Sequence, residues 1–314
     1  MDTKNKYLRF FDYIFILRPL ILIPVWDFFL IGNYLASQEN RFVLKPFLGL
    51  GVYTMLMGGI YILNQITDIN TDRLNKKLFI LSENFISLKN AYIEMVLLLG
   101  VSLFFSWFFG LYFFFLTVIS LIIGILYSLP PVKLKGKPFI DTLSNGIGYG
   151  MLNFALGWLM QRSFEWQMFL KFLPYFLSIS AVFINTTIVD IEGDRKSGEI
   201  TTSVFLGEKT SHVLSSILMA GAVFVSLIQK DIVCLLPSTI SLPLFLYTAI
   251  HCLLNKKINR SITILSFRLP GLIFTIITCI LYPVIIPFLF VVIIGMKIYY
   301  KKRFPIDYPT LTRG

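Results

Sequence analysis

The stretch Asn64-Gln-Ile-Thr-Asp68-Ile-Asn-Thr-Asp72-Arg73 ends a long apolar run, residues 46–66, with an amide and two carboxylates spaced four residues apart. On a helix this spacing places the side chains of Asn64, Asp68 and Asp72 on one face, one turn apart. Carboxylates at the end of a hydrophobic span are costly to place and need a cation or a polar partner. The stretch therefore predicts a polar site at the end of a membrane helix.

The same pattern returns as Asp190-Ile-Glu-Gly-Asp194-Arg195, after the apolar run 169–189. The separations 190 − 68 and 194 − 72 are both 122, so the two acidic pairs occupy equivalent places in two similar halves. A single pair with this spacing is common at a solvated helix end, but two matched pairs favour a site. We expect them to face each other across a helical bundle.

The composition indicates a membrane protein. Of the 314 residues, 56% are hydrophobic and 14% are charged, whereas soluble domains hold roughly 25% charged residues. The net charge of +11 fits basic cytoplasmic loops and anionic lipid headgroups, and we expect no nucleic-acid partner.

The fold class that these runs predict is all-α: a polytopic membrane helical bundle of about nine transmembrane helices in two similar halves. We expect one domain, residues 1–314, with halves at roughly 10–130 and 140–300. A span needs about 20 apolar residues, and the candidate runs are 14–35, 46–67, 91–109, 111–129, 143–162, 169–189, 212–229, 232–253 and 272–298.

The basic residues predict the orientation of the bundle. With the N-terminus inside, the inner segments hold 18 Lys and Arg residues and the outer loops hold 5, which is the cytoplasmic bias of membrane proteins. We therefore expect an integral multi-pass protein with a cytoplasmic N-terminus and both acidic pairs on the cytoplasmic side; in a prokaryote the membrane is the inner or plasma membrane. Nine spans leave the basic C-terminal tail on the outer side, against the rule.

The acidic pairs suit magnesium, which takes oxygen ligands and is held by a few carboxylates together with substrate phosphates. The predicted ligands are Asp68, Asp72, Asp190 and Asp194, with the amide oxygen of Asn64.

Basic residues near these pairs are candidates for contacts with a diphosphate. Arg73 and Arg195 each follow the last Asp of a pair, and Lys133 and Lys135 lie in the stretch Tyr127-Ser-Leu-Pro-Pro-Val-Lys-Leu-Lys on the same side. Arginine binds phosphate in a bidentate manner and lysine acts as a point charge. For any one of these cations, a loop charge that sets the topology remains an equal interpretation.

Further polar residues recur within the spans. Asp141, Asn145 and Asn153 are spaced by four and eight residues, and Asn185 lies in the sixth run. Polar side chains on one face of a membrane helix point into the bundle. Asn185 fits a site or plain helix packing equally well.

These motifs resemble the UbiA superfamily of intramembrane prenyltransferases. The resemblance rests on the spacing of Asn64, Asp68 and Asp72, on Asp190-Ile-Glu-Gly-Asp-Arg195 and on the stretch that begins at Tyr127. It extends through Gly148-Tyr-Gly150 and Gly198-Glu-Ile-Thr-Thr-Ser-Val-Phe-Leu-Gly207, and covers about residues 10–300.

The resemblance implies a nine-helix bundle, a Mg²⁺ cofactor and a prenyl diphosphate donor whose allylic bond ionises before an acceptor attacks. It implies catalytic roles for the four aspartates and for Tyr127, which would steady the leaving group or the cation. The residues from Asn75 to Ser87 lack the Arg-Pro pair that many members carry. The motifs look more like the branch with chlorophyll, homogentisate and archaeal-type lipid synthases, and the acceptor, an aromatic quinone precursor or a lipid-like molecule, stays open.

A cation-coupled membrane transporter is the alternative, because transporters also use repeated halves and intramembrane acids. That function predicts acids near the midplane of the bilayer and broken helices in both halves. Here the acids end their spans and are followed by cations, which favours an anionic substrate.

Overall fold

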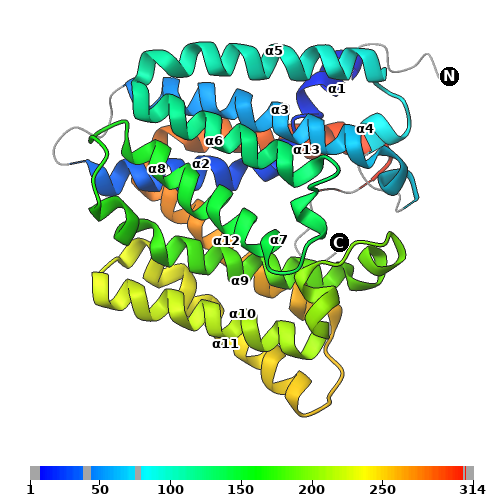
Figure 1. The fold of residues 1–314 in the computed structure, drawn as a ribbon, viewed down its shortest axis with the longest axis vertical. Coiled ribbons are helices and arrows are strands. Elements are labelled where there is room, and N and C mark those ends of the chain that lie inside the picture. The colour runs from blue at the N-terminus through cyan, green and yellow to red at the C-terminus, as the bar shows by residue number, and fades with distance from the viewer. Residues whose placement is uncertain (1–7, 38–43, 75–78, 307, 309–314) are drawn as a thin grey trace.

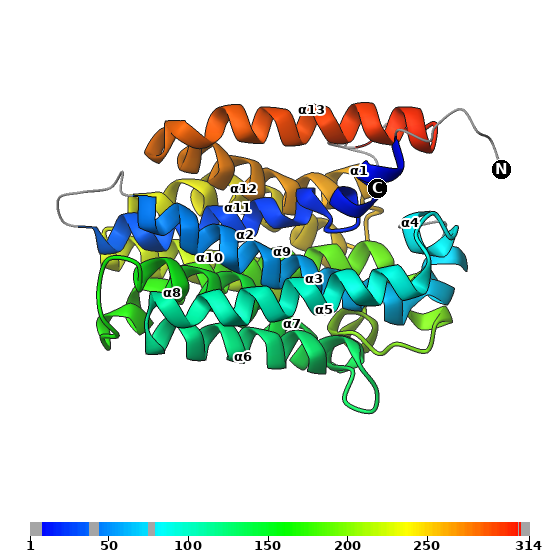
Figure 2. The same cartoon turned by 90° about the horizontal axis from the view of Figure 1, so that it is seen from above.

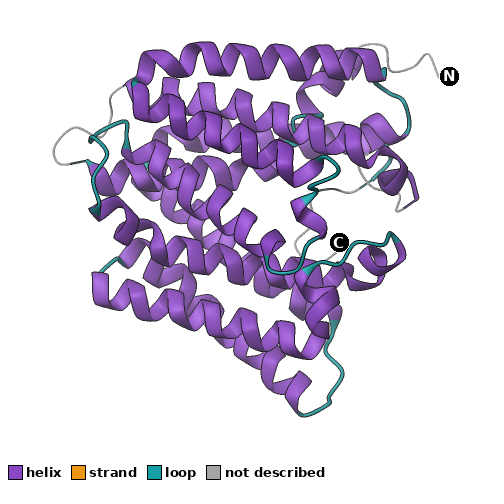
Figure 3. Cartoon of the chain, in the orientation of Figure 1, coloured by secondary structure: helices purple, strands orange, loops and turns teal. Residues whose placement is uncertain are grey.

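The computed structural model describes residues 8–37, 44–74, 79–306 and 308, and within these residues every regular element is a helix (Figure 3). The longer helices lie side by side along one direction (Figure 1). The elements are α1 (Arg9–Phe15), α2 (Pro19–Ala36), α3 (Leu44–Leu74), α4 (Phe79–Ser82), α5 (Leu88–Ser106), η2 (Trp107–Phe109), α6 (Leu111–Ser128), η3 (Leu134–Gly136), α7 (Ile140–Asn145), η4 (Gly146–Leu152), α8 (Asn153–Trp158), α9 (Gln167–Lys196), α10 (Thr202–Gln229), α11 (Ile232–Leu253), α12 (Arg260–Leu281), η5 (Pro283–Ile285) and α13 (Ile286–Arg303).

The predicted all-helical membrane bundle is confirmed. Nine helices in the described part of the chain are long and apolar enough to cross a bilayer: α2, α3, α5, α6, α9, α10, α11, α12 and α13. Helices α2, α3 and α9 are the most buried of these helices, and α5, α6 and α13 are the least buried. This distribution suits a bundle whose inner helices carry the polar residues and whose outer helices face lipid. The division into halves at 10–130 and 140–300 stays a prediction.

The predicted span 143–162 is not one continuous α-helix. It is made of α7, the π-helical turn η4 and α8, and π turns often mark functional sites. Small residues let this segment approach its neighbours: a Cβ added to Gly150 would lie 2.7 Å from Cα of Phe176, and one added to Gly157 would lie 1.7 Å from the carbonyl oxygen of Phe29. The segment therefore packs backbone against backbone on α9 and α2, as small residues allow in membrane bundles.

The predicted span 272–298 is wrong as a single helix. Helix α12 ends at Leu281, and α13 begins after a turn at Tyr282 and Pro283, where proline removes a backbone donor. The described residues thus hold nine candidate membrane helices and the interrupted segment 140–158. Arg303, at the end of α13, pairs with Asp12 of α1, so Lys301 and its basic neighbours lie at the same end of the bundle as α1, which agrees with the cytoplasmic bias of basic residues.

Helix α13 forms an outer layer beside α12, α2 and α1 (Figure 2). Its last turn is joined to α1 by a buried ion pair, in which Arg303 Nη2 donates to Asp12 Oδ2 at 2.7 Å. The hydroxyl of Tyr299 also donates to Asp12, at 2.5 Å, and the Arg303 guanidinium lies 4.2 Å from the ring centroid of Phe85. These contacts link the C-terminal helix to the start of the chain.

Arg303→Met is expected to destabilise the protein strongly. Removing one partner of a buried pair leaves an uncompensated charge, here on Asp12, at about 3–5 kcal/mol. The measurement is thermal unfolding of the purified protein in detergent. Lys301→Met, at an exposed position two residues earlier, is the control and should unfold close to the wild-type temperature; equal unfolding of the two variants would contradict a stabilising role for the pair.

Candidate active site

A cavity of about 580 Å³ lies between α3, α6, the α7–η4 segment and α9. Its lining includes all five predicted metal ligands together with Tyr127 and Lys135. The acidic residues of α3 and α9, separated by 122 positions, therefore face one space. We call this space the acidic cavity.

Helix α3 places Asn64, Asp68 and Asp72 at this cavity in the order that the spacing of four predicts. Asn64 Nδ2 donates to Ser128 Oγ at 3.2 Å. Because the amide nitrogen is used on α6, the amide oxygen remains as the atom that can accept or ligate.

Helix α9 supplies Asp190 and Asp194 from its last two turns. Oδ2 of Asp194 accepts a hydrogen bond from Thr201 Oγ1 at 3.2 Å. Thr201 also caps α10, where its side chain accepts from the backbone of Val204. Asp194 of the second acidic pair is thus held by the loop that leads from α9 into α10.

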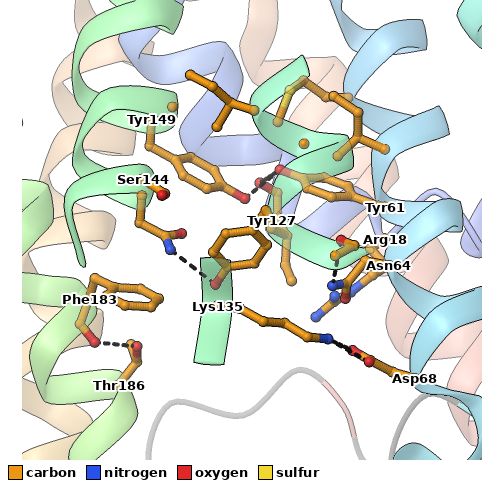
Figure 4. A pocket seen from close by; sticks show the side chains of 18 of the residues that line it. Arg18, Tyr61, Asn64, Asp68, Tyr127, Lys135, Ser144, Tyr149, Phe183 and Thr186 are labelled. Atoms are coloured by element: carbon orange, nitrogen blue, oxygen red, sulfur yellow. Dashed lines mark hydrogen bonds and ion pairs between the residues drawn. The ribbon is translucent and has the colours of Figure 1, made fainter. Parts of the chain in front are cut away.

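Lys135 is the buried cation of the site. It lies on η3, after Pro130 and Pro131 end α6, and its ammonium group forms an ion pair with both carboxylate oxygens of Asp68 (Figure 4). Only 9% of Lys135 is exposed. A buried lysine without an anion is unfavourable, so this side chain is committed to the acidic cavity.

Lys133 lies differently, although it is only two residues away. Its ammonium group is 2.7 Å from Oε1 of Glu199, and its side chain is 38% exposed. Glu199 itself lines the acidic cavity. Lys133 therefore stands at the rim and contacts the cavity through a carboxylate.

Tyr127 lines the cavity on α6 and accepts a hydrogen bond from Asn145 Nδ2 at 3.1 Å. The phenol proton of Tyr127 therefore remains for donation. Nearby, the hydroxyls of Tyr61 and Tyr149 lie 2.5 Å apart (Figure 4). Tyr149 sits on the π turn η4, so this irregular turn presents an aromatic ring to the site.

The rest of the cavity is more apolar and includes Met57, Ile60 and Leu152 in its lining. Tyr53, three turns before Asn64 on α3, also belongs to it, and its hydroxyl donates to Asn153 Oδ1 at 2.9 Å. One compartment thus combines a polar, acidic part with a region of hydrocarbon side chains.

Three predicted residues are not part of the cavity lining: Lys133, which stands at the rim, Arg73 and Arg195. Arg73 is exposed, and its Nε donates to the carbonyl oxygen of Ser82 at 2.9 Å. Arg195 is exposed at the end of α9. Their proposed contact with a diphosphate stays a prediction.

The cavity lining also contains polar residues that were not predicted from the sequence as site residues, among them Arg18, Tyr61, Tyr149 and Glu199. Arg18 has a left-handed backbone, with φ of 56°, directly before the proline that starts α2. A charged residue directly before Pro19, the first residue of an apolar helix, is a signal in the sequence from which Arg18 could have been predicted as a site residue. Tyr149 lies in the stretch Gly148-Tyr-Gly150 that contributes to the family resemblance, whereas Tyr61 carries no local pattern that separates it from packing aromatics.

The charges of the lining define what the cavity can bind. It contains five carboxylates and two cations, Lys135 and Arg18; the carboxylates are those of Asp68, Asp72, Asp190, Asp194 and Glu199. An anionic diphosphate is repelled by this excess of negative charge unless divalent cations bind with it. The oxygen-only ligand set and the available amide oxygen of Asn64 fit Mg²⁺.

A family model described as the UbiA prenyltransferase family matches residues 25–269. The chain belongs to the UbiA prenyltransferase family. The resemblance seen in the motifs is confirmed, and the match spans both acidic pairs.

Two curated relatives illustrate the range of the UbiA family. The chain is 31% identical over 217 residues to 2-acyl-4-prenylphloroglucinol 6-prenyltransferase of Humulus lupulus, and this alignment covers 63% of this chain and 52% of the relative. It is 28% identical over 196 residues to digeranylgeranylglyceryl phosphate synthase of Sulfolobus acidocaldarius, covering 62% of this chain and 69% of the relative. The chain spans about half the length of the first two curated relatives it matches.

Solved UbiA structures share the fold. A homologue from Archaeoglobus fulgidus bound to GPP and Mg²⁺ aligns with a TM-score of 0.65 at 23% identity, covering 85% of this chain and 98% of that one. A structure described for digeranylgeranylglyceryl phosphate synthase in membranes aligns with a TM-score of 0.64 at 25% identity, covering 85% and 98%.

Proposed function

We propose that this protein transfers a prenyl group from a prenyl diphosphate to an aromatic or lipid-like acceptor, in a Mg²⁺-dependent reaction at the cytoplasmic side of a membrane. The observation that carries the proposal is the meeting of both acidic pairs and the buried Lys135 at one cavity with an apolar continuation. The named activities of the UbiA relatives and the GPP and Mg²⁺ in a structural neighbour support the same assignment.

The acidic part of the cavity would hold the diphosphate. Asp68 and Asp72 on one side, and Asp190 and Asp194 on the other, would bind Mg²⁺, with Asn64 assisting. Bound Mg²⁺ supplies charge neutralisation for the leaving diphosphate. Lys135 lies beside Asp68 and would turn to a phosphate oxygen as the donor binds, which adds a second, protein-borne cation.

Carbon–oxygen bond breaking would leave an allylic cation next to aromatic rings. Tyr127, Tyr61 and Tyr149 line the cavity, and the negative face of an aromatic ring attracts a cation. The proton of Tyr127 is available to the departing phosphate, because its hydroxyl accepts from Asn145. The apolar lining at Met57 and Leu152 would exclude water, which would otherwise capture the cation.

The named relatives point to two chemical classes of acceptor. Relatives of this chain are named for phloroglucinol and homogentisate substrates, which are aromatic, and for a glyceryl phosphate, which is lipid-like. An acceptor has to reach the cation from the part of the cavity that the diphosphate leaves free. We therefore propose a membrane-dissolved acceptor of one of these two classes.

The arrangement weighs against a cation-coupled transporter. The two acidic pairs lie toward the ends of α3 and α9. The offset of 122 pairs α2 with the interrupted segment 140–158, and α2 is continuous. Transporters of that kind place broken helices in corresponding positions of both halves.

The proposal is tested by incubating the purified protein in lipid nanodiscs with geranyl or geranylgeranyl diphosphate and Mg²⁺. Homogentisate or geranylgeranylglyceryl phosphate is added in turn, and products are identified by mass spectrometry. We expect diphosphate release that requires Mg²⁺, together with a product in which the prenyl group replaces one hydrogen of the acceptor and the proton is lost to solvent. Folded protein that neither releases diphosphate nor binds the donor would overturn the enzyme assignment and direct the next assay to ion transport.

A further inference from the structure

A second cluster of possible metal ligands lies outside the acidic cavity, between α10 and α11, which pack side by side (Figure 1). Glu208 and His212 are one turn apart on α10, and Cys252 is near the end of α11. One ligand atom from each side chain lies within 4.8 Å of the other two. None of the three residues lines the acidic cavity.

His212 gives an independent indication of a ligand. Its side chain is fully buried, yet neither Nδ1 nor Nε2 has a hydrogen-bond partner. Burying a polar group without a hydrogen-bond partner is unfavourable. A metal ion bound to one ring nitrogen would satisfy the histidine and explain why it faces a carboxylate and a thiol.

The donor set selects the class of metal. Imidazole nitrogen, thiolate sulfur and carboxylate oxygen together suit zinc and similar transition metals, and three protein ligands with an open fourth position are a common zinc arrangement. Magnesium prefers oxygen ligands only. Glu208 is exposed, so an ion and a water molecule can reach the fourth position from solvent.

We propose that Glu208, His212 and Cys252 bind a zinc-type divalent cation at a site separate from the acidic cavity. The thiol would lose its proton to solvent on binding, and one Zn–S, one Zn–N and one Zn–O bond would form. No redox step is involved.

The position of this site suggests what it stabilises. Helix α10 is broken at Gly207, where φ is 76° and ψ is 163°, directly before Glu208. On the other side of the break, Thr201 holds Asp194, and the backbone N–H of Thr202 donates to Asp141 at 2.8 Å. A metal that joins α10 to α11 would fix the helix next to this break and steady the turn beside the second acidic pair.

Cobalt titration of the purified full-length protein, in detergent without other metals, tests the site. Co²⁺ bound to a thiolate absorbs in the near ultraviolet and, when tetrahedral, gives intense visible bands, whereas oxygen ligands in the acidic cavity give neither. We expect one Co²⁺ per chain to produce both signals, Zn²⁺ to remove them, and excess Mg²⁺ to leave them unchanged.

Cys252→Ser should abolish the near-ultraviolet band, and Cys279→Ser, at another half-buried free cysteine, should keep it. Glu208→Gln, at an exposed position, should weaken Co²⁺ binding at least about tenfold even if the cysteine variant folds poorly. A wild-type protein without the band, or a band that survives both Cys252→Ser and Glu208→Gln, would overturn the proposal.

Discussion

Replacing Asp190 with Asn is expected to lower prenyl transfer about 100-fold or more while the protein stays folded. The substitution keeps the shape of the side chain and removes one negative charge from the face of α9 that lines the acidic cavity. Loss of a single group that stabilises developing charge typically lowers turnover by about 10²–10³-fold. The variant should also need more Mg²⁺ for half-maximal activity, because fewer anionic ligands remain.

Glu192→Gln is the matched control for this experiment. Glu192 lies two residues further along the same helix, is exposed and does not line the cavity. It should retain nearly full activity and the wild-type dependence on Mg²⁺. Thermal unfolding in detergent checks that both variants are folded. Equal losses in the two variants, or an active Asp190→Asn protein, would contradict the role given to this face of α9.

Lys135→Met is expected to lower kcat roughly 10- to 100-fold, because a hydrogen bond to a charged group contributes about 1.5–3 kcal/mol. The same variant should bind Mg²⁺ more tightly, since Lys135 no longer competes for the Asp68 carboxylate. Titration of activity against Mg²⁺ separates the two effects. A fall in kcat with a lower half-saturating Mg²⁺ concentration is the expected pair of results.

Two neighbouring lysines, Lys137 and Lys133, serve as controls for the Lys135→Met variant. Lys137 is exposed, so Lys137→Met should leave activity unchanged. Lys133 forms a partly exposed ion pair with Glu199, and such pairs contribute only about 0–1 kcal/mol, so Lys133→Met should have a small effect. If the variants at positions 133 and 135 behaved alike, burial beside Asp68 would not be what makes Lys135 important.

The four aspartates of the site could be predicted, because their spacing in the sequence determines which side chains share a helix face. Side chains four residues apart share a helix face, and two pairs at the same offset imply two equivalent helices. The cavity accordingly gathers Asp68, Asp72, Asp190 and Asp194. Their part in catalysis remains a prediction.

The contacts of the individual cations could not be predicted in this way. In the sequence, Lys133 and Lys135 look alike, because both are basic residues of the same loop. The conformation of the turn after α6 decides that Lys135 is buried against Asp68 and that Lys133 pairs with Glu199. Arg73 follows its acidic pair just as the motif requires, yet its guanidinium contacts the backbone of Ser82. Long side chains reach in several directions, and tertiary packing selects one.

The sequence predicts a single span, 272–298, where the structure has the two helices α12 and α13, for a related reason. Apolar composition continues across Tyr282 and Pro283, and hydropathy alone does not separate a kinked helix from two helices. The buried pair of Asp12 with Arg303 joins positions 291 residues apart. No local pattern contains that contact, although a count of nine spans places the basic C-terminal residues on the outer side, against the usual bias of basic residues.

Binding of metal and diphosphate between the two acidic pairs is tested by an experimental structure with Mn²⁺ in place of Mg²⁺ and a prenyl thiolodiphosphate, whose carbon–sulfur bond resists cleavage. The anomalous signal of Mn²⁺ locates each metal ion independently of the protein map. We predict metal within about 2.0–2.3 Å of carboxylate oxygens from both acidic pairs, with the diphosphate between them and the prenyl chain in the apolar part of the cavity. Metal and diphosphate bound elsewhere, or a diphosphate held in the acidic cavity without any metal, would contradict this binding mode.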